Sequence, residues 1–168
     1  MKTIMYFFLA LALITFSCNK DEEQIKPLVP ISGNLVNTPD PSGGFDQILM
    51  PDGTTVSLPK KYKVSGTCGY LGAIDESKSF LEIAHNFKGL FVGEVKITLT
   101  GEKGDQLLLQ GTVYTAADFS NKGYFHFIGG TGIFKNAEGW MNSIGQFDQN
   151  GINTLSAAGE ITEPSNNN

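Results

Sequence analysis

Histidine and cysteine, two residue types that serve both in catalysis and in metal binding, are scarce in this sequence. The 168 residues include two histidines, His85 and His126, and two cysteines, Cys18 and Cys68. Their spacing is not that of a metal site, and no His-Glu-x-x-His, Cys-x-x-Cys or Gly-x-Ser-x-Gly motif occurs. The sequence therefore predicts no metal and no cofactor. Whether the protein is an enzyme stays open at this point.

His85 is the best candidate for proton transfer or for contact with a ligand. It alternates with Leu81, Ile83 and Phe87, so it faces the interior if those apolar side chains do. The alternative is a histidine near a strand end that is bonded to backbone or water. Cys68 lies in a similar apolar alternation, which is typical of a buried thiol rather than a nucleophile.

The N-terminal residues resemble the signal peptide of a bacterial lipoprotein. Lys2 precedes an apolar run from Ile4 to Ile14, which is shorter than the ~20 residues of a membrane-spanning helix. Cys18 follows where a lipoprotein signal is cleaved, so we expect residues 1–17 to be removed and Cys18 to carry the lipid. An ordinary secretory signal with a chance cysteine is the alternative.

The residues after Cys18 bear on where the protein is displayed. Asn19-Lys20-Asp21-Glu22-Glu23 resembles the export tag of surface-displayed lipoproteins in some Gram-negative bacteria. We therefore expect attachment to the outer membrane through the lipid, with the domain exposed at the cell surface. A domain that faces the periplasm, with a plain solvated linker, is the alternative.

The charge composition argues against nucleic acid as a partner. Lysine accounts for all 12 Lys and Arg residues, against 17 Asp and Glu, and the formal net charge is -5. A chain without arginine and with an acidic balance lacks the positive field that nucleic-acid binders use.

The distribution of proline and glycine divides the chain after the signal. Residues 18–60 hold six of the seven prolines and predict an extended tether, within which Pro51-Asp52-Gly53 favours a hairpin over residues 47–58. Residues 61–163 contain alternating apolar and polar segments separated by glycine-bearing turns, and form the predicted domain. Residues 164–168 are expected to be a disordered tail.

The alternating segments predict an all-β fold. Eight of them are recognisable, at residues 61–71, 79–88, 90–100, 106–116, 123–129, 133–141, 143–149 and 152–162. Short connections favour antiparallel neighbours, and eight strands can close into a barrel that leaves no free edge. We expect a single eight-stranded antiparallel β-barrel, and a β-sandwich is the alternative fold.

One motif carries a family resemblance. The stretch from Phe125 to Gly139 contains Gly-Gly-Thr-Gly-x-Phe-x-x-Ala-x-Gly, which resembles a pattern of the calycin-like barrel superfamily of allene oxide cyclases and dirigent proteins. The resemblance covers residues 62–162 and implies an eight-stranded barrel with an axial pocket. We interpret its small residues as a structural turn: Gly129, Gly130, Thr131, Gly132, Ala137 and Gly139.

These features lead to two expectations about function, and a passive surface component that forms homo-oligomers through outward apolar residues such as Leu108, Tyr114 and Ile128 is a third alternative. The first expectation is a lipid-anchored barrel that binds a small apolar ligand or serves as an interaction module. The second is a cyclase-like or dirigent-like enzyme that steers a reactive intermediate in its pocket. The candidate pocket residues are His85, Cys68, Tyr62, Tyr70, Phe125, Phe127 and Phe134.

Overall fold

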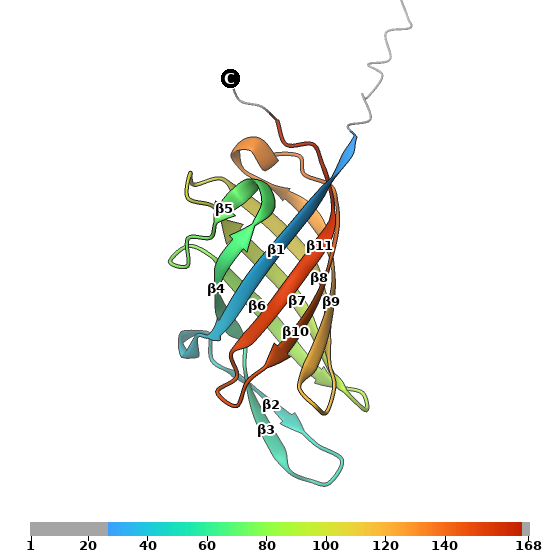
Figure 1. The fold of residues 1–168 in the computed structure, drawn as a ribbon. Coiled ribbons are helices and arrows are strands. Elements are labelled where there is room, and N and C mark those ends of the chain that lie inside the picture. Colours follow the sequence, from blue (N-terminus) through green and yellow to red (C-terminus); the bar gives the residue numbers. More distant parts are fainter. Residues whose placement is uncertain (1–26, 166–168) are drawn as a thin grey trace, which may run out of the picture.

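The computed structural model describes residues 27–165, which form a closed β-barrel (Figure 1). The barrel strands follow one another in the order β1-β11-β10-β9-β8-β7-β6-β4, and β1 pairs with β4 to close the ring. These eight strands are β1 (Leu28–Pro39), β4 (Lys61–Cys68), β6 (Phe80–Phe87), β7 (Phe91–Thr100), β8 (Gln106–Thr115), β9 (Ser120–Gly130), β10 (Gly139–Phe147) and β11 (Asn153–Thr162). The predicted antiparallel barrel is confirmed, and the sandwich alternative is wrong.

Shorter elements complete the described fold. Strand β5 (Gly72–Ala73) pairs with the end of β4, and β2 (Phe45–Leu49) and β3 (Thr55–Pro59) form a separate hairpin. Three 3₁₀ turns are present: η1 (Pro41–Gly43), η2 (Gly69–Leu71) and η3 (Gly132–Phe134). Within residues 27–165, no helix is long and apolar enough to cross a bilayer. The predicted signal peptide, Cys18 and residues 166–168 lie outside the described residues.

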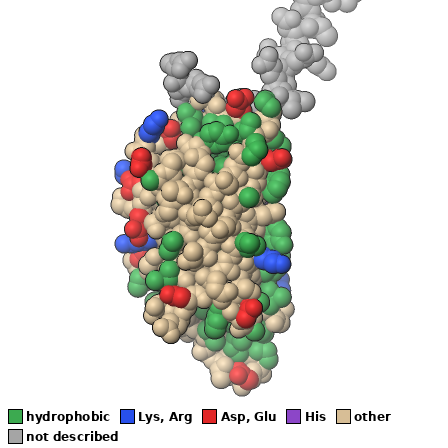
Figure 2. All heavy atoms as spheres, viewed as in Figure 1, with side chains coloured by type: hydrophobic (Ala, Val, Ile, Leu, Met, Phe, Trp, Pro, Cys, Tyr) green, Lys and Arg blue, Asp and Glu red, His purple; other side chains and the backbone are tan. Residues whose placement is uncertain are grey.

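Period-two alternation builds the core, as β9 illustrates. Phe125 and Phe127 point into the barrel and are buried, while the alternate residues Tyr124 and His126 are exposed. The other barrel strands contribute inward leucine, isoleucine and valine side chains to the same cluster. The outer surface over β1 and β11 carries mostly short uncharged side chains, and charged side chains lie toward its margins (Figure 2).

The predicted tether was wrong for residues 28–39, because these residues form β1. This strand pairs with β11 along its length and with β4 from Gly33 onward, so it closes the barrel. The two prolines of this strand suggested a linker, but each lies at a position where a β-strand tolerates proline. Pro30 precedes the pairing with β4, and Pro39 is the last residue of the strand.

The strand predicted at residues 133–141 was also wrong. Its first part forms η3 and a turn, and a single strand, β10, joins the end of the segment predicted at 133–141 to most of the segment predicted at 143–149. Phe134 and Ala137 looked like strand residues because they are apolar, but they are buried in the turn at one end of the barrel. The predicted number of eight barrel strands was nevertheless right, because two predicted segments correspond to the single strand β10 and the unpredicted β1 restores the count.

The two ends of the barrel differ. At the end where β9 finishes and β10 begins, the side chains of Phe134 and Ala137 are buried and close the barrel. We call the opposite end, where β1 finishes and β4 begins, the open end. There, the inward residues Ile83, Val113 and Phe147 are only partly buried.

Candidate functional site

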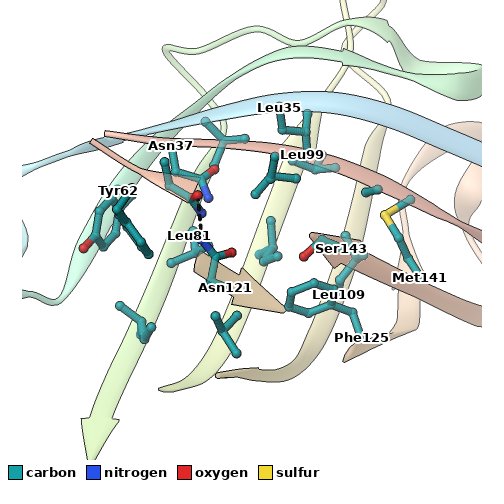
Figure 3. A pocket seen from close by; sticks show the side chains of 18 residues that line it. Leu35, Asn37, Tyr62, Leu81, Leu99, Leu109, Asn121, Phe125, Met141 and Ser143 are labelled. Atoms are coloured by element: carbon teal, nitrogen blue, oxygen red, sulfur yellow. Dashed lines mark hydrogen bonds between the residues drawn. The ribbon is translucent and has the colours of Figure 1, made fainter. Parts of the chain in front are cut away.

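A small cavity lies inside the barrel toward its open end (Figure 3). Its volume is about 40 Å³, which provides room for a few water molecules. Apolar side chains from all eight barrel strands form most of its wall, among them Leu35, Leu81, Leu99, Leu109, Phe125 and Met141. No charged side chain of the described residues lines it.

Four uncharged polar side chains interrupt this apolar wall: Asn37, Asn121, Ser143 and Asn153. All four residues are buried, with at most 5% of their surface exposed. Asn121 Nδ2 donates a hydrogen bond of 2.9 Å to Asn153 Oδ1. Because Asn37 is the register partner of Asn153 on the adjacent strand, three carboxamides from β1, β9 and β11 gather at one side of the cavity.

Asn37 is the unusual member of this group. Its Oδ1 atom is buried and has no hydrogen-bond partner among the described residues. A buried polar atom without a partner costs about 1–3 kcal/mol of stability. The cavity therefore presents a hydrogen-bond acceptor that a donor group of a bound molecule can satisfy.

Tyr62 and Phe147 form an aromatic pair where the cavity approaches the open end. Their ring centroids are 6.5 Å apart, and both residues line the cavity. Burial raises the pKa of Tyr62 to about 12. The phenol is therefore neutral at physiological pH and adds no charge to the site.

His85 lies at the open end, one inward position beyond Ile83 on β6, and does not line the cavity. Its Nδ1 is 3.2 Å from Oδ2 of Asp46, and the same oxygen accepts the main-chain N–H of His85 at 2.8 Å. Lys60 Nζ lies 3.3 Å from the other carboxylate oxygen. We call these interactions of Asp46 with His85 and Lys60 the Asp46 contact.

One of the two titratable groups of this contact is charged at neutral pH and the other is not. Burial lowers the pKa of His85, and its attraction to Asp46 opposes this effect without overcoming it. Burial raises the pKa of Asp46, but hydrogen bonds from His85 and Lys60 outweigh burial, so this pKa lies below its ordinary value. At neutral pH, a neutral imidazole therefore donates from Nδ1 to a charged carboxylate.

The structure separates the other candidate pocket residues. Tyr62 and Phe125 line the cavity, whereas Phe127 and Phe134 are buried in the core away from it. Cys68 is also buried off the cavity, and burial raises the pKa of its thiol to about 11. Tyr70 was wrongly placed in the pocket, because it lies in η2 and is 48% exposed.

The glycine-rich motif forms the turn between β9 and β10. Gly129 and Gly139 have φ angles of 112° and 125°, in the region that favours glycine. Thr131 Oγ1 accepts the main-chain N–H of Gln106 at 2.9 Å and so joins the turn to β8. Gly130 packs so closely that an added Cβ would lie 2.1 Å from the Gln106 carbonyl oxygen. These contacts account for the motif as a structural element.

Candidate metal ligands do not cluster in the described part of the chain. Within residues 27–165, no three His, Cys, Asp or Glu side chains gather closely enough to hold an ion. The polar groups that do gather, the three asparagines, are neutral ligands. They carry no negative charge that would balance a buried cation.

The described residues form a closed eight-stranded antiparallel β-barrel around this cavity, and dirigent proteins of known structure share this fold. A scan of family models finds no match to the chain, and a search of curated proteins finds none either. Among solved structures, the pterocarpan synthase dirigent protein PsPTS1 matches with 13% identity and a TM-score of 0.51, over 83% of this chain and 97% of that one. The pterocarpan synthase dirigent protein GePTS1 matches with the same identity and TM-score, over 85% and 89%. At this identity, the similarity concerns the fold.

Proposed function

We propose that the barrel binds a small, neutral and mostly apolar molecule that carries one hydrogen-bond donor. The observation that carries this proposal is the buried, unpartnered Oδ1 of Asn37, which belongs to an otherwise apolar cavity. An uncharged wall disfavours ions, because a charge without a partner is costly to bury. The apolar side chains would enclose the body of the ligand, and Asn37 would accept its hydroxyl or amine proton.

The size of the cavity defines how such a ligand would enter. A volume of about 40 Å³ lies far below the roughly 300–1,000 Å³ of sites for drug-sized ligands. The ligand must therefore displace side chains or a segment at the open end. The lining residues best suited to move are the partly buried ones: Ile83, Val113, Phe147 and Leu155.

A fluorescence titration with phenylnaphthylamine, a neutral apolar probe with one N–H donor, tests this proposal. We expect saturable binding by the wild type and at least about tenfold weaker binding by Val113→Phe, because the larger ring fills the cavity entrance. Gln110→Phe adds the same ring to an exposed position of the same strand and is expected to bind like the wild type. Equal binding by all three proteins would exclude the cavity as the site.

A steering enzyme is the second candidate function. The observation that favours it is the set of carboxamides held in place on three strands, since fixed dipoles can orient a reactive intermediate. The fold shared with two pterocarpan synthase dirigent proteins is consistent with such a role. Native mass spectrometry of the protein with molecules extracted from its source membrane would distinguish the two functions. A binder returns the ligand unchanged, whereas an enzyme releases a rearranged or coupled product.

We also propose that Cys18 carries a lipid that anchors the barrel to the outer membrane, with the domain at the cell surface. The signal-like residues 1–17 and the acidic stretch after the cysteine support this location. Mass spectrometry of the mature N-terminal peptide is expected to find acyl chains on Cys18. Cys18→Ser should shift the protein from the membrane to the soluble fraction. Protease treatment of intact cells then tests display, because only a surface domain is degraded.

A further inference from the structure

The β2–β3 hairpin is a separate element at the open end of the barrel. It joins the end of β1 to the start of β4 and is not part of the barrel sheet (Figure 1). The apolar side chains of Phe45 and Leu49 are 47% and 70% exposed. The alternate side chains Asp46, Ile48, Val56 and Leu58 are partly buried, and no residue of the two hairpin strands is fully buried. The attachments of the hairpin to the barrel therefore determine its position.

The Asp46 contact joins the hairpin to strand β6 of the barrel through side chains, beside one main-chain hydrogen bond of 2.9 Å from Ile83 N–H to the Lys60 carbonyl at the hairpin base. One carboxylate oxygen accepts the His85 main-chain N–H at 2.8 Å and contacts the imidazole at 3.2 Å. The other oxygen pairs with Lys60 at the base of the hairpin. The side chains of His85 and Asp46 are only 9% and 19% exposed, so solvent screens their interaction less than that of a surface pair.

The base of the hairpin is built so that it can bend. Gly44 has a φ angle of 77° and follows the short turn η1. Its carbonyl oxygen accepts the N–H of Lys60 at 3.0 Å and closes the base. Changes in the dihedral angles on either side of this bond would move the hairpin as a unit about its base.

We propose that the β2–β3 hairpin is a lid for the cavity, and that the Asp46 contact holds it in its closed position. The far end of the barrel is closed by Phe134, so a molecule must enter at the open end. His85 lies one inward position beyond Ile83, a lining residue, and the contact therefore fixes the hairpin beside the entrance. Which molecule the lid admits depends on the proposed function, on which this proposal rests. Access to the cavity, however, can be measured without that ligand.

The test measures how fast a thiol reagent reaches the cavity. Ser143→Cys places a thiol on the cavity wall, and peptide mass spectrometry follows its modification by N-ethylmaleimide separately from the native cysteines. Adding Asp46→Ala is expected to raise the modification rate about tenfold, since hydrogen bonds to a charged group hold the lid. Asp52→Ala, at the exposed tip of the same hairpin, is the matched control and is expected to change the rate less than about twofold.

Two further readouts separate the possible outcomes. Ala157→Cys provides a second thiol on the cavity wall if Ser143→Cys does not fold. Hydrogen exchange at the His85 amide reports loss of the contact itself. Faster exchange with an unchanged modification rate at the cavity would overturn the lid. Failure of phenylnaphthylamine to bind the wild type would instead overturn the proposed function. The modification rates of the cavity thiol would still show whether the hairpin acts as a lid.

Discussion

Phe134→Ala is expected to lower the free energy of unfolding by about 3–5 kcal/mol, the range for truncation of a buried phenylalanine. The ring is 1% exposed and closes one end of the barrel. The turn that holds the ring is tight, with Phe134 N–H donating to the Thr131 carbonyl at 3.1 Å. Neighbouring strands are fixed by the barrel hydrogen bonds and cannot collapse into the space, so the cavity term adds to the lost transfer energy.

Urea denaturation followed by circular dichroism measures this effect. The matched control is Phe119→Ala, which removes the same ring from a position that is 62% exposed and should change stability by less than about 0.5 kcal/mol. Since small domains are stable by about 5–15 kcal/mol in total, Phe134→Ala removes a large share of that stability. A loss as small as that of the control would show that Phe134 does not close the barrel.

Alternation was enough to predict most of the barrel, because a half-buried strand must alternate. The sequence from Phe91 to Thr100 illustrates this, with inward Val95, Ile97 and Leu99. The first strand was missed because the position of a proline relative to its pairing partner decides whether the proline is tolerated. That partner, β4 or β11, lies far along the chain and is unknown before the fold is assembled.

The candidate site was harder to predict than the fold. Aromatic residues suggested a pocket lining, but Phe127 and Phe134 fill space instead, and only the packing of all strands determines where a void remains. The three asparagines were not among the predicted pocket residues, since asparagine near the end of a strand is also common in turns. Their signal was present in the alternation, since Asn37 shares its face with Ile31 and Leu35.

The contact between His85 and Asp46 could not be found from the sequence. The two residues are 39 positions apart, and Asp46 lay in the segment interpreted as a tether. Alternation does place His85 on the inward face of its strand, as expected. The packing of the hairpin against β6 supplies the partner, and local patterns do not encode that packing.

Asn37→Leu is expected to stabilise the barrel and to weaken ligand binding. Leucine has nearly the shape of asparagine and leaves no buried acceptor without a partner, so we expect a gain of about 1–3 kcal/mol. The same substitution removes the acceptor for the ligand donor and should weaken phenylnaphthylamine binding about tenfold or more. Opposite effects on stability and binding are typical of a residue kept for function at the expense of stability.

Asn34→Leu is the matched control for this substitution. Asn34 lies on the same strand but faces outward, where its Oδ1 accepts a hydrogen bond of 2.9 Å from Ser156. Binding by Asn34→Leu should equal that of the wild type, and thermal denaturation provides the stability comparison. If Asn37→Leu proved less stable than the wild type, a buried water would already satisfy Oδ1, because only a satisfied carboxamide contributes stability that leucine cannot replace. In that case a bound ligand would have to displace this water. The hydrogen bond from the ligand to Asn37 would then contribute less to the free energy of binding.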